Sequence, residues 1–134
     1  MKKYATELGI EKFVDFRDVV TRKELIELYS SCTMVCLPSV YEPFGLTVLE
    51  GAGCGKPVIT TTNSGASEIV DNWKNAVVVR PGDSKDLAAA MLKLLRDKNL
   101  RKTIGENAID LAKKYSWKLA AEETMKVYKE LDRK

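Results

Sequence analysis

The chain has 134 residues, of which 45% are hydrophobic and 31% charged, and its formal net charge is +3; these values are typical of one soluble domain with its own core. No apolar run approaches the ~18 residues of a membrane span, and residues 1–7 form no signal-peptide core, so we expect no transmembrane segment. Lysine and arginine are spread along the chain instead of forming a block, which argues against a nucleic-acid partner.

The first third of the chain predicts a helix, a strand and a second helix. Residues 1–9 have helical spacing, and Gly9 can supply the left-handed residue that ends a helix. Residues 13–16 read as a short strand. Thr21 and Glu24 have the spacing of a capping box, in which each side chain accepts a hydrogen bond from the other residue's backbone N–H. A helix with one buried stripe therefore follows, to about residue 32; the stripe consists of Leu25, Leu28, Tyr29 and Cys32.

The middle of the chain alternates strands with loops and helices. Residues 34–37 form a short apolar run without polar alternation, which is typical of a parallel strand covered on both faces. A loop leads to a helix that begins at Leu46 and ends by Gly55, because Pro57 cannot continue it. Further strands are predicted at residues 58–61 and 76–79, with a turn and short helix between them at residues 63–69.

Three helices complete the prediction. Asp83 caps the first, the second spans about residues 100–115, and Ser116 caps the third, which runs to residue 131. Alternating strands and helices predict an α/β fold: a Rossmann-like, three-layer αβα arrangement around a parallel sheet with right-handed crossovers. Such folds bind ligands beyond the carboxyl ends of their strands.

One strand end carries a candidate site, between Pro38 and Glu50. Gly45, Leu46 and Thr47 stand at the start of a helix, where unpaired N–H groups and the helix dipole favour an anion. Glu42 and Glu50 are carboxylates that accept hydrogen bonds from hydroxyl groups. A phosphate flanked by two hydroxyl-bearing rings, as in a sugar nucleotide, matches this pattern. The competing interpretation is an ordinary loop and helix surface without a ligand.

The same stretch resembles the Glu-x7-Glu signature of retaining family 4 glycosyltransferases, which have two facing Rossmann-like domains (the GT-B architecture). The matching residues are Pro38, Ser39, Glu42, Phe44, Gly45, Leu46 and Glu50. Gly51 stands where that family usually has Ala, and Ser64 replaces the first Gly of its second donor loop. The resemblance covers about residues 3–131 and implies the carboxyl-terminal donor-binding domain of such an enzyme.

Carried over position by position, the resemblance implies donor-binding roles. The donor sugar would contact Glu42, Phe44 and Gly45, the phosphate would contact Gly45, Leu46 and Thr47, the ribose would contact Glu50, and the base would be bordered by Phe16, Arg17 and Val19. The donor would be a UDP-, GDP- or ADP-sugar, with no cofactor and no metal. No catalytic residue is expected within this chain alone, because the family is thought to use the donor phosphate as the base.

The resemblance also implies what the chain lacks. Residues 1–134 would be a single partial nucleotide-sugar-binding domain without its first strands, and residues 116–131 would be the helix that crosses to an amino-terminal acceptor domain. The chain alone is therefore expected to be inactive. The strand at residues 13–16 would lose its neighbour, so we expect either that it moves beside the strand at residues 34–37 or that two chains pair through their exposed edges.

The cysteines bear on location. The chain has three cysteines, an odd number, and Cys32, Cys36 and Cys54 all lie in apolar surroundings. This pattern predicts reduced thiols in a cytoplasmic protein. The protein would lie at the inner membrane surface if its acceptor lies there. With no histidine in the chain, a zinc site is not expected.

The favoured function is donor binding in a retaining glycosyltransferase that transfers a hexosyl group to an acceptor hydroxyl. The alternative is a non-catalytic binding or assembly module.

Overall fold

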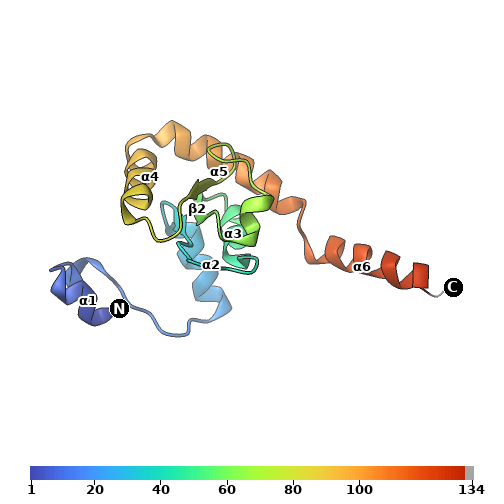
Figure 1. Cartoon of the computed structure of the whole chain (residues 1–134), viewed down its shortest axis with the longest axis horizontal. Coiled ribbons are helices and arrows are strands. Elements are labelled where there is room, and N and C mark those ends of the chain that lie inside the picture. Colours follow the sequence, from blue (N-terminus) through green and yellow to red (C-terminus); the bar gives the residue numbers. More distant parts are fainter. Residues whose placement is uncertain (132–134) are drawn as a thin grey trace.

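The structure, a computed structural model, describes residues 1–131 and centres on a three-stranded parallel sheet (Figure 1). Its strands are β1 (Val35–Cys36), β2 (Val58–Thr61) and β3 (Val77–Val79), in the order β1-β2-β3. Val35 pairs with Val58, and Ile59 with Val77. The strands therefore lie where the sequence predicts them, although β1 is shorter than expected, and the α/β fold with a parallel sheet is confirmed.

Helices cover both faces of the sheet. The first face packs on α2 (Arg22–Ser31) and α3 (Leu46–Gly53), and the second on α4 (Ser84–Arg96) and the first half of α5 (Lys98–Lys113). Neighbouring residues of β2 point in opposite directions, so Val58 joins the cluster beneath α3 while Ile59 joins the cluster beneath α4. Both side chains are fully buried.

Hydrogen bonds at the helix ends follow the predicted caps. In the capping box of α2, the Thr21 hydroxyl accepts from the Glu24 N–H at 3.3 Å and the Glu24 carboxylate accepts from the Thr21 N–H at 2.7 Å. The Asp83 carboxylate accepts from the first amides of α4, and the Ser116 hydroxyl from the Leu119 N–H at the start of α6 (Trp117–Leu131). The helices α2, α4 and α6 therefore begin where a side chain satisfies free amides of the first turn.

The predicted strand at residues 13–16 is wrong. A 3₁₀ turn, η1 (Glu11–Phe13), occupies its start, and residues 14–20 have no regular secondary structure. A strand needs a neighbour for its N–H and C=O groups, and this segment does not reach β1, so the expectation that it pairs beside β1 is wrong as well. Phe13 is consequently 77% exposed.

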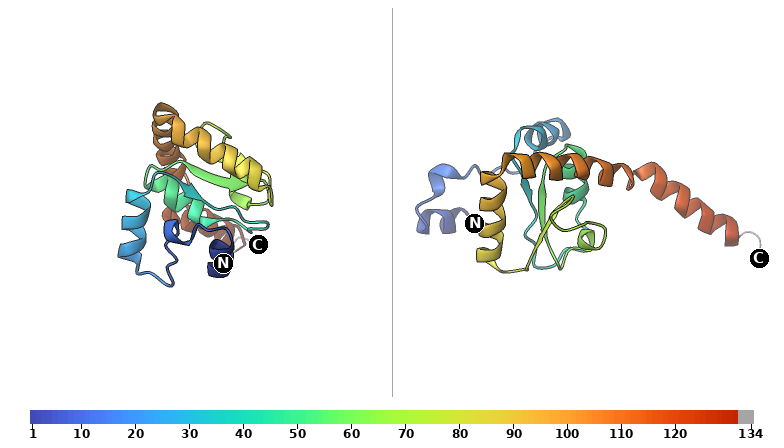
Figure 2. Two further views of the ribbon diagram at one scale, coloured as in Figure 1. Left: turned by 90° about the vertical axis from the view of Figure 1, so that its left-hand side faces the viewer. Right: turned by 90° about the horizontal axis from the view of Figure 1, so that it is seen from above.

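The two ends of the chain extend away from the sheet. Figure 1 and the right-hand view of Figure 2 place α1 (Lys2–Glu7) and the segment that follows it apart from the central layers, while α6 projects from the far end of α5. No residue of α6 is buried. None of the described helices is long and apolar enough to cross a membrane.

Candidate functional site

Two loops meet at the carboxyl ends of β1 and β2. The loop after β1 holds Glu42, whose N–H donates to the Asn63 carbonyl at 3.1 Å and whose carbonyl accepts from the Gly65 N–H at 3.0 Å. Below them, the Thr61 hydroxyl donates to the Ser39 carbonyl at 2.7 Å. The backbone around Glu42 is thus held on both sides, and its half-buried side chain starts from a fixed position.

Gly45 turns the chain from this loop into α3. Its φ of +94° lies in the left-handed region, which favours glycine. A Cβ atom at this position would lie 2.9 Å from the Ser64 Oγ and 3.0 Å from the Leu37 Cδ2, so space as well as backbone conformation requires glycine. The tight turn brings the start of α3 to the strand ends.

Ser64 is one of the two residues that depart from the resembled family, and the structure gives its hydroxyl a partner. Ser64 is 2% exposed, and its hydroxyl donates to the Phe44 carbonyl at 3.0 Å. The Ala66 N–H donates to the same carbonyl at 2.6 Å. The serine therefore connects the loop after β2 to the turn before α3.

The start of α3 is open to an anion. Within residues 1–131 no side chain caps this helix, whose N-cap residue is Gly45. The amides of Leu46 and Thr47 belong to its first turn, where N–H groups have no partner within the helix and the dipole is positive. Leu46 is 50% exposed and Phe44 is 36% exposed, so a ligand can approach this turn.

Glu50 lies in the second turn of α3, on the same side as Thr47, and contacts α2. Its Oε2 accepts a hydrogen bond from the Tyr29 hydroxyl at 2.9 Å. Burial, followed by the hydrogen bond to Glu50, raises the pKa of Tyr29 to about 12, whereas a hydrogen bond with Thr47 acts in the opposite direction. In the described part of the chain, neither Glu42 nor Glu50 forms an ion pair.

Sequence reasoning did not identify Tyr29 as part of the site. It placed Tyr29 on the buried stripe of α2, and the ring does pack against a buried cluster that includes Val35 and Val48. The feature of the sequence that could have indicated its role is the hydroxyl group of Tyr29, which lies on an otherwise apolar stripe. Only the docking of α2 beside α3 shows which carboxylate that hydroxyl reaches.

A cavity of about 530 Å³ adjoins the site. Phe44, Leu46 and Glu50 form one wall, Arg22 contributes from the start of α2, and Trp117 and its neighbours contribute from the junction of α5 and α6. Sequence reasoning missed these cavity residues from α2 and the α5–α6 junction, because nothing in the local pattern places them beside α3. The volume is in the range of small-molecule sites.

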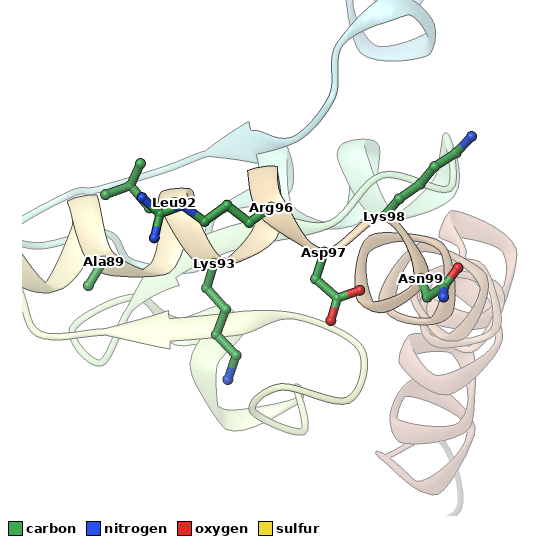
Figure 3. Close-up of a pocket in the computed structure, with 7 residues that line it drawn as sticks. All are labelled: Ala89, Leu92, Lys93, Arg96, Asp97, Lys98 and Asn99. Carbon is green, nitrogen blue, oxygen red and sulfur yellow. The ribbon is translucent and has the colours of Figure 1, made fainter.

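A larger hollow, of about 730 Å³, lies where α4 meets α5 and contains none of the predicted site residues (Figure 3). Its polar side chains do not converge on one point: Lys93 and Lys98 point in different directions, and the Lys93 ammonium lies 3.9 Å from the centre of the Trp73 ring. We therefore assign the candidate site to the cavity beside α3.

The residues expected to border the base are not brought to this cavity. Phe16, Arg17 and Val19 lie in the irregular segment before α2, and none of them lines the cavity within the described chain. Val19 is fully exposed, and Arg17 pairs with Asp15 at 2.7 Å. Of the residues predicted for the donor, Phe44, Leu46 and Glu50 line the cavity. Gly45 and Thr47 belong to the adjoining start of α3, whereas Glu42 and the expected base contacts are not among the lining residues in the described part of the chain.

The thiols and the acidic residues complete the chemistry of this region. Cys32, Cys36 and Cys54 are free and half-buried. Burial raises the pKa of Cys36, with a smaller contribution from Cys32. Among the described residues, no group of three or more Cys, Asp or Glu side chains is placed to hold a metal ion.

Comparisons with known proteins match this architecture. The model of the family "Glycosyl transferases group 1" matches residues 1–111. D-inositol 3-phosphate glycosyltransferase of Corynebacterium jeikeium is 40% identical over 95% of this chain and 30% of its own length. Sucrose-phosphate synthase from Thermosynechococcus elongatus superposes with a TM-score of 0.92 at 28% identity, over 98% of this chain and 33% of that one.

A solved structure with a ligand is also similar. Anabaena Alr3699/HepE in complex with UDP-glucose superposes with a TM-score of 0.79 at 31% identity, over 84% of this chain and 30% of that one. The same protein has been solved with UDP. The chain thus spans about a third of the length of these relatives.

Proposed function

The chain belongs to the glycosyl transferases group 1 family, and we propose that it is the nucleotide-sugar-binding part of a retaining glycosyltransferase. The observation that carries this proposal is the joint placement of the Glu42 loop, the uncapped start of α3 and Glu50 beside one cavity. The UDP and UDP-glucose bound by the similar Anabaena protein support the same class of ligand.

Each part of the donor has a matching group. The amides of Gly45, Leu46 and Thr47 would bind the distal phosphate, because the helix start offers both donors and positive potential. The Glu42 carboxylate would accept hydrogen bonds from hydroxyl groups of the sugar, and the amides of Phe44 and Gly45 would donate to its oxygens. Glu50 would accept hydrogen bonds from the ribose hydroxyls. Each hydrogen bond to a carboxylate would contribute about 1.5–3 kcal/mol.

The proposed reaction transfers a hexosyl group to an acceptor hydroxyl. The bond between the sugar's anomeric carbon and the phosphate oxygen breaks, a bond from the acceptor oxygen to that carbon forms with the same stereochemistry, and the leaving nucleoside diphosphate takes the acceptor's proton. Because the donor phosphate serves as the base, no acid–base pair in this chain is needed. The acceptor would bind on the rest of the enzyme, so this chain alone would bind donor without transferring sugar.

The chain's residues support neither a cofactor nor a metal in this proposal. Phosphate binding rests on backbone amides, and sugar binding on carboxylates, so the donor (a UDP-, GDP- or ADP-sugar) is the only small molecule it requires. The three free thiols favour a reducing compartment. We therefore place the parent enzyme in the cytoplasm, at the inner membrane surface if its acceptor lies there.

One observation favours the alternative of a non-catalytic module. Phe16, Arg17 and Val19 lie outside the cavity within the described chain, so the contacts expected for the base are not assembled. A donor site without base contacts would bind nucleotide sugars weakly, and the chain would then serve as a binding or assembly unit.

Isothermal titration calorimetry with UDP-glucose, GDP-mannose and ADP-glucose separates the two functions. We expect saturable binding of one of these donors and a loss of about ten- to hundredfold in affinity for Glu50→Gln, because a charged hydrogen bond is lost. Glu106→Gln is the matched control, since Glu106 is an exposed α5 residue outside the cavity. Absence of saturable binding for all three donors would favour the non-catalytic module.

A further inference from the structure

A hydrogen-bonded pair links α2 to α3 at the edge of the site. Tyr29 and Glu50 are 21 residues apart in sequence, and the Tyr29 hydroxyl lies 2.9 Å from the Glu50 Oε2. The body of the Tyr29 ring packs against the buried cluster of Val35, Val48, Val58 and Ala66. The hydroxyl is thus fixed by packing, while the carboxylate it reaches is on an exposed residue.

The hydrogen bond from Tyr29 occupies one of the two carboxylate oxygens of Glu50. The phenol has one O–H group, and Glu50 receives it. Because this bond uses Oε2, the second oxygen of the carboxylate, Oε1, is left as an acceptor for a ligand.

We propose that Tyr29 is a positioning residue of the donor site, which holds the Glu50 carboxylate so that its Oε1 meets the ribose hydroxyls. The inference rests on the proposed function, since it takes the ribose as the ligand of Glu50. A glutamate side chain has several rotatable bonds, and the hydrogen bond from the packed Tyr29 phenol restricts the positions that the Glu50 carboxylate can adopt. Preorganisation of this kind increases affinity because less freedom is lost on binding.

The pair also defines which ligands the site prefers. An ionised carboxylate only accepts hydrogen bonds, so Oε1 binds preferentially a ligand that presents hydroxyl donors at this point. A nucleotide without the 2′ and 3′ hydroxyls has no donor to offer Glu50. Tyr29 should therefore affect the binding of ribonucleotides and leave that of dideoxynucleotides unchanged.

Calorimetric titrations of the 134-residue chain with UDP and 2′,3′-dideoxy-UDP test this inference. We expect Tyr29→Phe to weaken UDP binding by about three- to tenfold, the scale of one lost hydrogen bond, with no change for the dideoxy analogue. The effect should disappear in the Glu50→Gln background, because the two residues act as a unit. Tyr4→Phe is the control, since Tyr4 is 62% exposed on α1 and lies outside the site.

Two results of the binding measurements would overturn the positioning role. Equal weakening of UDP and dideoxy-UDP by Tyr29→Phe would show that the hydroxyl only supports the packing of α2 on α3. Unchanged UDP binding by Tyr29→Phe, where Glu50→Gln weakens it, would show that Glu50 needs no support. Thermal unfolding of both variants shows whether any loss of binding reflects loss of the fold.

A measurement without ligand keeps this inference separate from the proposed function. The phenol carbon of Tyr29, followed by NMR in alkaline titration, should report a pKa that falls toward the ordinary value near 10 in Glu50→Gln. An unchanged pKa would mean that the pair does not form and would overturn the positioning role. If the pKa falls but no nucleotide binds the wild-type chain, the pair exists and the ribose assignment is wrong.

Discussion

Gly51 of α3 packs directly on Val35 of β1. A Cβ atom at position 51 would lie 3.0 Å from the Val35 Cγ2 and 3.0 Å from the Val58 Cγ2. The branched side chains of two neighbouring strands thus fill the space that an alanine would occupy. This contact explains why glycine stands here, one residue after Glu50, where the resembled glycosyltransferases usually have alanine.

We predict that Gly51→Ala destabilises the chain. Alanine is favoured over glycine in a helix by about 1 kcal/mol, but overpacking a filled core costs about 1–3 kcal/mol, so we expect a net loss of about 1 kcal/mol in the free energy of unfolding. Urea denaturation measures it. Gly53→Ala is the matched control, because its nearest neighbour would be the Ala112 Cβ at 3.9 Å; this substitution should stabilise the chain, and a stabilising Gly51→Ala would contradict the contact.

The Ser64 hydroxyl should contribute measurably to the stability of the loop after β2. Ser64→Ala removes the hydrogen bond to the Phe44 carbonyl but does not leave that carbonyl unpaired, since the Ala66 N–H also donates to it. We therefore expect a loss of about 1 kcal/mol, the ordinary value for one hydrogen bond. Chemical denaturation of Ser64→Ala beside Ser31→Ala, an exposed serine of α2, provides the comparison. Equal losses of stability at both positions would show that the hydrogen bond from Ser64 to the Phe44 carbonyl contributes no more than the hydroxyl of an exposed serine.

Stability should fall in acid partly through Asp83. Hydrogen bonds from the backbone N–H groups of Asp86 and Lys85 and the charge of Arg80 lower the pKa of the Asp83 carboxyl, the Asp86 bond most. Because its folded pKa lies below the unfolded value of about 3.9, its stabilisation is complete above pH 4 and is lost as the pH falls through the folded pKa.

The comparison of wild type with Asp83→Ala tests this pH dependence. The urea midpoint of the variant should lie below that of the wild type at pH 7, and the two midpoints should converge as the pH falls through the folded pKa of Asp83 and its carboxyl is protonated. Asp83→Asn separates charge from hydrogen bonding, because it keeps an N-cap acceptor without a charge. A difference between wild type and Asp83→Ala that stays constant with pH would contradict a role for the ionised form.

The outer edge of β1 should promote self-association. The N–H groups of Val35 and Leu37 donate to β2, so the backbone groups of Cys36, between them, face the open edge of the sheet. Such edges pair with other chains. We predict a dimer at high protein concentration. Size-exclusion chromatography with light scattering measures the mass of the species in solution, and a strictly monomeric species at high concentration would contradict the prediction.

How far the sequence alone reaches is clearest at the helix ends. Thr21 and Glu24, Asp83 and Ser116 act on backbone groups within a few residues of themselves, so their spacing in the chain was enough to predict where α2, α4 and α6 begin. The same holds for Gly45 and the start of α3, and hence for the place of the candidate site at a strand end. These features depend on local chemistry and on the periodicity of apolar residues.

Contacts between segments far apart in the chain required the tertiary structure. The bond from Tyr29 to Glu50, the Ser64 hydroxyl on Phe44 and the close approach of Gly51 to Val35 all depend on how helices and loops settle against the sheet. The failed strand at residues 13–16 has the same origin, since a short apolar segment forms a strand only where a neighbouring strand pairs with its backbone groups. Local pattern thus located the carboxylates, while packing decided which group holds Glu50 in place.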